Sequence, residues 1–233
     1  MRGIFITGTD TNVGKTTMAA GLARLLKNNG VDVGVMKPFA TANKIFSNKY
    51  KSEDAALLSK AARVNDSDNE INPYFYSIPT APSIAAKIRN QEQVRLIDAK
   101  NKLIGLANKH SYTIIEGIGG LMVPLNEKEL VLDFIRLIRL PILLVASTKL
   151  GTINHILLTI KVCSLYGLKI KGIIFNGALK KPNEVERYIV DTVKSITGIE
   201  VLCIIPKLKD VSSQNVSLSM KNNIDIEKLL DVK

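Results

Sequence analysis

The sequence predicts an α/β protein in which a mostly parallel central sheet lies between two layers of helices. Six short, apolar, β-branched runs recur along the chain, and segments with apolar residues at helical spacing lie between most of them. This alternation is typical of parallel strands that are joined by crossover helices. With 233 residues and 46% hydrophobic content, the chain can bury a large core as a single domain, residues 1–233.

The predicted strands and helices follow one another from the first residues onward. The expected strands are residues 4–7, 31–36, 112–116, 142–147, 170–175 and 201–205. The expected helices are residues 15–28, 52–62, 93–109, 154–166 and 183–195, with a short terminal helix at 224–230. Segment 40–82 is rich in Pro, Ser and Asn, and we expect Pro73, Pro79 and Pro82 to interrupt regular structure there. Because long connections are often functional, this segment is expected to form a wall of the active site.

The most specific motif spans residues 8–16, GTDTNVGKT, which match G-x-x-x-x-G-K-[ST] between the first strand and the first helix. Its glycines let successive backbone N–H groups curl around an anion, and the helix adds its positive N-terminal end. Lys15 can reach the β- and γ-phosphates, while the Thr16 hydroxyl suits a Mg²⁺ held by phosphate oxygens. The motif predicts nucleotide binding and a fold like that of the P-loop NTPases; the alternative is an ordinary turn before a helix.

Two carboxylates are candidate metal ligands beside this loop. Ligands of open parallel sheets bind beyond the carboxyl ends of the strands, and Glu116 ends an apolar strand there. We expect Glu116 to hold Mg²⁺ opposite Thr16, although a turn-forming carboxylate has the same pattern. Asp54 lies near a helix start, where a carboxylate is also favourable to the helix dipole alone.

Two further polar residues follow other predicted strands. Lys37 precedes Pro38, which fixes the local backbone, and a second ammonium near the γ-phosphate would stabilise charge during phosphoryl transfer. The alternative is a lysine that faces solvent. Asn176 could hydrogen-bond an adenine edge, because a side-chain amide offers a donor and an acceptor, or it could simply form a turn.

The composition argues against other kinds of chemistry. The formal charge of +11 comes from lysines scattered along the chain, and aromatic residues make up only 5%, so we expect attraction of small anions and no nucleic-acid partner. Cys163 and Cys203 lie in apolar surroundings without C-x-x-C spacing, which favours buried, reduced thiols. Two histidines are too few for a histidine-based metal cluster, so Mg²⁺ on oxygen ligands is the expected metal.

The apolar runs also bear on localisation. They have the length of strands, and no basic-then-apolar leader precedes the first strand. We therefore expect a cytoplasmic protein with no membrane partner.

Five segments together resemble dethiobiotin synthetase, the ATP-dependent cyclo-ligase of biotin biosynthesis. They are GTDTNVGKTT at 8–17, KPFAT at 37–41, PTAP at 79–82, EGIGGLMVPL at 116–125 and KLGTINH at 149–155. The segments keep the order of the family and span most of the chain. The first recurs in related amide-forming synthetases, whereas the second and the fifth make the set more specific.

The resemblance implies a reaction and its catalytic residues. The family joins CO₂ to 7,8-diaminononanoate as a carbamate, phosphorylates it with MgATP to a carbamic-phosphoric anhydride, and closes the ureido ring with release of ADP and phosphate. Lys15 and Lys37 would neutralise the carbamate and the transferring phosphoryl group. Thr16, Asp54 and Glu116 would hold Mg²⁺.

The resemblance also implies binding residues. Nucleotide contacts would come from Asn12, Val13, Gly14, Lys15, Thr16, Thr17, Asp54, Glu116, Gly117, Gly119, Asn176, Pro206, Lys207 and Leu208. Substrate contacts would come from Thr11, Lys37, Thr41, Gly151, Thr152 and Asn154. Members of the family resemble one another in forming homodimers, so residues 151–154 of one subunit would close over the substrate tail of the other, with the substrate site at the subunit interface.

Two departures from the family pattern and two alternatives remain. Many members have an acid where Asn12 stands and Ser where Thr41 stands.

A cobyrinate-type amide-forming synthetase shares the first motif but usually carries a glutaminase domain, for which this chain is too short. A dimeric nucleotide switch of the ParA/MinD kind typically has a second lysine where Thr9 stands, and segment 224–230 is too acidic for a membrane anchor.

Overall fold

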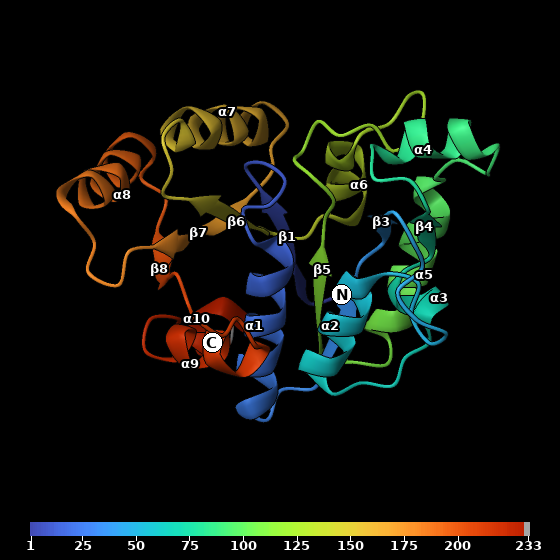
Figure 1. The fold of residues 1–233 in the computed structure, drawn as a ribbon, viewed down its shortest axis with the longest axis horizontal. Helices are drawn as coiled ribbons and strands as arrows, with labels where there is room; N and C mark the ends of the chain where they lie inside the picture. The colour runs from blue at the N-terminus through green and yellow to red at the C-terminus, as the bar shows by residue number, and fades with distance from the viewer. Residues whose placement is uncertain (231–233) are drawn as a thin grey trace.

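A six-stranded parallel sheet forms the centre of the protein, of which a computed structural model describes residues 1–230 (Figure 1). The strand order is β2-β5-β1-β6-β7-β8, and every neighbouring pair is parallel. The strands are β1 (Gly3–Gly8), β2 (Val33–Met36), β5 (Tyr112–Glu116), β6 (Ile142–Ser147), β7 (Ile170–Ala178) and β8 (Val201–Pro206). All six predicted strands are present. Residues 231–233 of the predicted domain lie outside the described residues.

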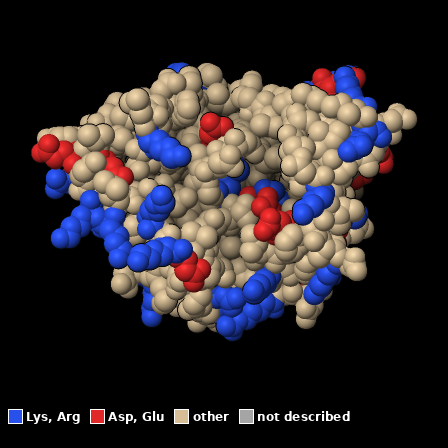
Figure 2. All heavy atoms as spheres, in the orientation of Figure 1, with Lys and Arg blue, Asp and Glu red and all other residues tan. Residues whose placement is uncertain are grey.

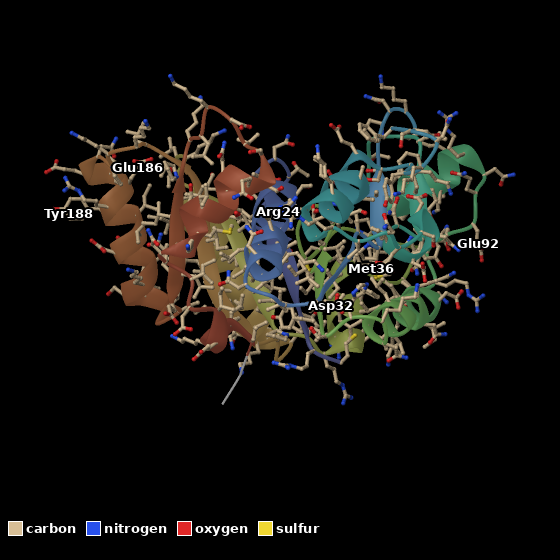
Figure 3. All side chains as sticks on the ribbon, turned by 90° about the horizontal axis from the view of Figure 1, so that it is seen from below. Arg24, Asp32, Met36, Glu92, Glu186 and Tyr188 are labelled. Atoms are coloured by element: carbon tan, nitrogen blue, oxygen red, sulfur yellow. The ribbon has the colours of Figure 1, made fainter. Side chains whose placement is uncertain are left out.

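Helices cover both faces of this sheet (Figures 1 and 3). One face carries α1 (Lys15–Asn28), α2 (Glu53–Ala62), α9 (Ser213–Lys221) and α10 (Ile226–Leu230). The other carries α5 (Leu96–Ala107), α6 (Val131–Ile138), α7 (Thr152–Leu165) and α8 (Glu184–Thr197). Ile4 and Ile6 belong to one core and Phe5 to the other, because successive strand side chains point to opposite faces. The predicted three-layer α/β fold is therefore confirmed.

The sheet places the ends of several strands around one point. The chain runs from β1 to β2 on one side of the sheet, whereas β6, β7 and β8 are added on the other side. Ligands in open α/β sheets bind at such a switch point, outside the carboxyl ends of the strands. The loop that follows β1 lies there, with Lys37 directly after β2 and Glu116 at the end of β5.

Segment 40–82 is more regular than predicted. It contains most of a separate two-stranded parallel sheet, β3 (Phe39–Thr41) with β4 (Tyr74–Tyr76), and the short helix α3 (Asp68–Ile71). The prediction that prolines exclude regular structure was wrong here because Pro73 precedes its strand and Pro82 is the first residue of α4 (Pro82–Arg89). In both places a missing backbone N–H breaks no bond within the element. Helices α6 and α9 were also missed: α6 is short and α9 is mostly polar.

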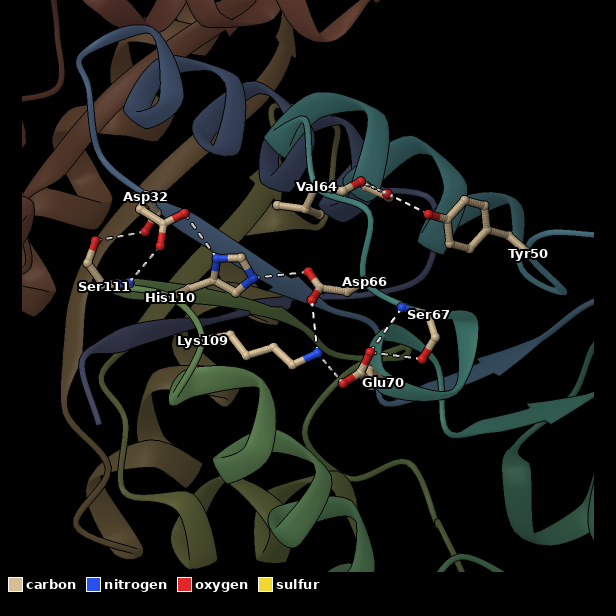
Figure 4. Close-up of polar contacts among 10 residues, drawn as sticks. Asp32, Tyr50, Val64, Asp66, Ser67, Glu70, Lys109, His110 and Ser111 are labelled. Carbon is tan, nitrogen blue, oxygen red and sulfur yellow. Dashed lines mark hydrogen bonds and ion pairs between the residues drawn. The ribbon is translucent and has the colours of Figure 1, made fainter.

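A polar network fastens α3 and the loop before it to the sheet (Figure 4). The His110 ring lies between two carboxylates, with Nδ1 3.0 Å from Asp32 Oδ1 and Nε2 3.0 Å from Asp66 Oδ2. Lys109 adds an ion pair with Glu70 and a longer one, 3.5 Å, with Asp66. These contacts join the starts of β2 and β5 to the segment that leads into β4.

The cysteines, the basic side chains and the helix lengths can be compared with what the sequence predicts. Cys163 and Cys203 are buried and unpaired, and burial raises the pKa of their thiols to about 11 and about 12. Lys and Arg side chains are spread widely over the face in Figure 2. Within residues 1–230, none of the helices has the length and apolar character that a membrane span requires.

Candidate functional site

A cavity of about 760 Å³ lies at the carboxyl ends of β1, β2 and β5. It is lined by Thr11, Asn12, Gly14, Lys15, Thr16, Thr17, Lys37, Ala40, Thr41, Asp54, Pro79, Thr80, Ala81, Glu116, Ile118, Gly119 and Val123. Figure 2 shows a hollow near the middle of the molecule in which basic and acidic side chains lie together. A larger groove of about 920 Å³ lies between α5 and α6, and its lining contains none of the predicted site residues. We therefore place the site by its chemistry, in the smaller cavity.

The phosphate loop has the conformation that its glycines allow. Gly14 is the N-cap of α1 with φ of 94°, and a Cβ at this position would lie 2.1 Å from Asn176 Nδ2. Asn12 also has a positive φ, 58°, which Asn tolerates better than most residues. The Asn176 amide donates to the Val13 carbonyl at 2.9 Å, so it supports the loop, a contact that the sequence did not predict.

Lys15 folds back onto this loop. Its Nζ donates to the carbonyl oxygen of Asp10 at 2.7 Å, and the residue is only 7% exposed. Burial and the nearby charge of Lys37 lower the pKa of Lys15 to about 8. An anion in the cavity would offer the ammonium a much stronger partner than a carbonyl oxygen.

Lys37 is the centre of a buried charge cluster. Its Nζ lies 2.6 Å from Glu116 Oε1 and 2.9 Å from Asp54 Oδ2, and it donates to the Gly117 carbonyl at 3.1 Å. Although burial alone would lower the pKa of Lys37, the two carboxylates raise it above its ordinary value. Burial would likewise raise the pKa of Asp54, but the Lys37 ammonium holds it below its usual range. Lys37 and Asp54 therefore keep their charges at neutral pH, whereas burial raises the pKa of Glu116 above its ordinary value although the Lys37 ammonium opposes the shift.

The same carboxylates form an oxygen-rich donor set with Thr16. The Thr16 hydroxyl donates to Glu116 Oε1 at 2.7 Å, while the buried Oε2 has no hydrogen-bond partner. Hydroxyl and carboxylate oxygens suit a hard divalent cation such as Mg²⁺. Among residues 1–230, no group of three or more His, Cys, Asp or Glu is placed to hold a metal alone. The residues thus fit a Mg²⁺ that phosphate oxygens and water also coordinate.

Some of the remaining predicted residues line a second cavity of about 500 Å³ on the other side of the phosphate loop, namely Val13, Thr152, Asn176 and Lys207. Its lining is Thr9, Asp10, Thr11, Asn12, Val13, Ser147, Thr148, Lys149, Leu150, Thr152, His155, Asn176, Gly177 and Lys207. Pro206 ends β8 beside it, and Leu208 packs against the core. Gly151 caps α7 with φ of 90°, and Asn154 is exposed on the first turn of that helix; neither residue lines the first or the second cavity.

Sequence reasoning missed a residue that orders the second cavity. Glu186 on α8, labelled in Figure 3, is only 8% exposed. Its carboxylate accepts hydrogen bonds from the Thr148 hydroxyl at 2.9 Å and from the Leu179 N–H at 3.0 Å. The contacts join the loops that follow β6 and β7. Sequence alone gives no sign of these hydrogen bonds, because a glutamate is common in the polar first turn of a helix.

Comparison with known proteins identifies the family. Residues 2–215 match the family model described as "AAA domain". The ATP-dependent dethiobiotin synthetase BioD of Nitrosopumilus maritimus (strain SCM1) is 41% identical over 233 residues, which covers 99% of this chain and 100% of that protein. The chain belongs to the dethiobiotin synthetase family. The same enzyme of Bacillus subtilis (strain 168) is 38% identical, over 99% of this chain and 98% of its own length. The prediction of an ATP-dependent ligase is confirmed by this membership.

Solved structures show how widely the fold is shared. MinD cell division protein of Aquifex aeolicus has a TM-score of 0.59 at 14% identity, covering 96% of this chain and 95% of its own. A ParA family ATPase of Chlorobium tepidum TLS has a TM-score of 0.57 at 18% identity, and the match covers 98% of this chain and 97% of the ATPase chain. These likenesses confirm the P-loop NTPase-like fold and concern the fold alone.

Proposed function

We propose that the protein makes dethiobiotin from 7,8-diaminononanoate, CO₂ and ATP. The observation that carries this proposal is the meeting of a phosphate loop, two buried lysines and two carboxylates in one cavity, in a chain of the dethiobiotin synthetase family. No covalent enzyme nucleophile is needed for this chemistry, because phosphorylation activates the carbamate and binding holds the reactants in line.

The reaction has three steps. One amine of the substrate adds to CO₂ and loses a proton, which gives a carbamate. A carbamate oxygen attacks the γ-phosphorus of ATP, the bond to the ADP oxygen breaks, and a carbamic-phosphoric anhydride forms. The second amine then attacks the carbamate carbon, phosphate leaves, and the amine proton is lost as the ring closes.

Lys15 and Lys37 are the proposed catalytic residues. Lys15 would exchange its Asp10 carbonyl partner for phosphate oxygens, and Lys37 would stabilise charge on the transferring phosphoryl group. Fixed charges in a buried site act more strongly than charges in water. Thr16, Asp54 and Glu116 would hold Mg²⁺, which when bound would neutralise charge on the phosphates.

Substrate recognition is proposed to use both sides of the phosphate loop. Thr11 and Thr41 line the first cavity, where they would contact the carbamate or the diamine. Asn176 and Lys207 line the second cavity, and with Pro206 and Leu208 they would surround the adenine.

A homodimer would complete the substrate site. Leu150, just before α7, is fully exposed, and the start of that helix lies away from the first cavity. A second subunit over this surface would let Gly151, Thr152 and Asn154 close over the substrate tail of the partner.

The test is a reconstituted reaction. Purified protein is incubated with MgATP, bicarbonate and the diamine, and the cyclic urea is followed by mass spectrometry beside ADP release. We expect one ADP for each urea and no urea without the diamine. ATP hydrolysis that DNA or lipid stimulates, with no response to the diamine, would support a nucleotide switch instead; amide formation from ammonia would support a cobyrinate-type synthetase.

A further inference from the structure

The backbone around Lys37 is held by the chain that leads into β4. The Lys37 N–H donates to the Ile71 carbonyl at 2.8 Å, and the Tyr74 N–H donates to the Pro38 carbonyl at 3.2 Å. The carbonyls of successive residues point to opposite sides of a regular strand, so main-chain donors of one partner strand do not reach both Lys37 and Pro38. Because Pro38 takes the main-chain bond, the Lys37 carbonyl needs a donor from a side chain.

The side chain of Asn72 supplies that donor. Asn72 Nδ2 donates to the Lys37 carbonyl at 2.7 Å and to the Tyr74 carbonyl at 3.1 Å. Asn72 is only 1% exposed, so these two bonds replace the water that its amide nitrogen loses on burial. Its Oδ1 is buried without a hydrogen-bond partner, which indicates that the amide is retained for its donors.

This contact acts on the lysine at the centre of the charge cluster. Both backbone polar groups of Lys37 are held by residues 71 and 72, and Pro38 restricts the backbone on the other side. The Lys37 side chain extends from this fixed point to Glu116 and Asp54. We propose that Asn72 is a positioning residue, which sets the place of the Lys37 ammonium through its backbone. This inference rests on the proposed function, because it assigns a consequence for turnover.

The first variant removes the donor. A displacement of about 1 Å at a reacting group can lower turnover about 10²-fold. For Asn72→Ala we expect kcat for dethiobiotin formation to fall between about 10-fold and 100-fold. The KM for ATP should change less than about twofold, because Asn72 does not touch the phosphate loop. Asn126→Ala is the matched control, since Asn126 Nδ2 donates to the Val94 carbonyl at 2.9 Å, away from Lys37.

The second variant separates the donor from packing. Asn72→Leu keeps the branched shape of the side chain but offers no donor to the Lys37 carbonyl. If the donor sets the place of Lys37, Asn72→Leu lowers kcat about as much as Asn72→Ala. If Asn72 only fills space, Asn72→Leu recovers most of the kcat that Asn72→Ala loses.

The outcomes separate this inference from the proposed function. Normal kcat in Asn72→Ala, or near-normal kcat in Asn72→Leu, overturns the inference. Equal losses in Asn72→Ala and Asn126→Ala overturn it as well. If the wild type makes no cyclic urea, the proposed function fails. The melting temperatures then test the hydrogen bond by itself: Asn72→Ala and Asn72→Leu should both melt below the wild type, because each leaves the Lys37 carbonyl without its donor, and a wild-type melting temperature in Asn72→Leu would contradict the contact.

Discussion

Replacement of Lys37 by methionine gives the most direct test of the charge cluster. Lys37→Met keeps the length of the side chain and removes the ammonium that contacts Glu116 at 2.6 Å, Asp54 at 2.9 Å and the Gly117 carbonyl at 3.1 Å. The loss of one preorganised electrostatic contact in an active site lowers kcat about 10²-fold to 10³-fold. We expect a loss of that size, with little change in the dissociation constant for ATP.

The same variant should lose stability. The Lys37 side chain is 5% exposed and that of Glu116 is 1% exposed, so water cannot replace the ammonium beside Glu116. Removal of one partner from a buried ion pair destabilises a protein by about 3–5 kcal/mol. The Asp54 side chain is 39% exposed and can be hydrated, which favours the lower end of that range.

The assay combines single-turnover ADP release with calorimetric titration of ATP, well below the melting temperature of each protein. Lys128→Met, at an exposed lysine, controls for the substitution itself. Near-normal turnover would refute the proposed role of Lys37. A loss of ATP affinity as large as the loss of kcat would refute it too, because it would mean that Lys37 binds the ground state and the transition state equally.

Three further predictions concern other contacts. Glu116→Gln should shift the Mg²⁺ titration of activity to higher concentration, and an unchanged curve would remove Glu116 from the metal site. Gly14→Ala should abolish nucleotide binding, because φ is 94° and the new Cβ would lie 2.1 Å from Asn176 Nδ2; normal binding in a fluorescence titration would show that the loop can rearrange. A hydrogen bond from Lys109 lowers the pKa of Glu70 to about 2. The ionised Glu70 should therefore stabilise the fold fully at pH values above its pKa in the unfolded chain, near 4.5, and this contribution should be lost as the pH falls toward 2. Chemical denaturation of wild type and Glu70→Gln should therefore differ by less than about 1 kcal/mol at pH 6 and converge near pH 2, and a difference that grows in acid would contradict the assignment.

The sequence predicted those parts of the site that local patterns encode. The phosphate loop is contiguous, and Glu116 ends a strand whose apolar run is evident, so both could be placed before the structure was considered. The ion pairs of Lys37 could not, because its partners come from α2 and β5, and only the sheet order brings those elements together. Asn176 shows a further limit, since its support of Val13 depends on β7 passing close to the phosphate loop.

Pro73 shows why a proline is an uncertain breaker of structure. Pattern reasoning treats it as the end of regular structure, because it lacks the N–H that a ladder requires. In this protein β4 begins one residue later, and the Tyr74 N–H donates to the Pro38 carbonyl at 3.2 Å, so the proline costs no bond of the ladder. The Lys37 carbonyl instead takes its bond from the Asn72 side chain, 35 residues away in the sequence, so local propensity cannot reveal the contact. The side chain that precedes this proline is therefore also the one that we propose sets the place of the Lys37 ammonium.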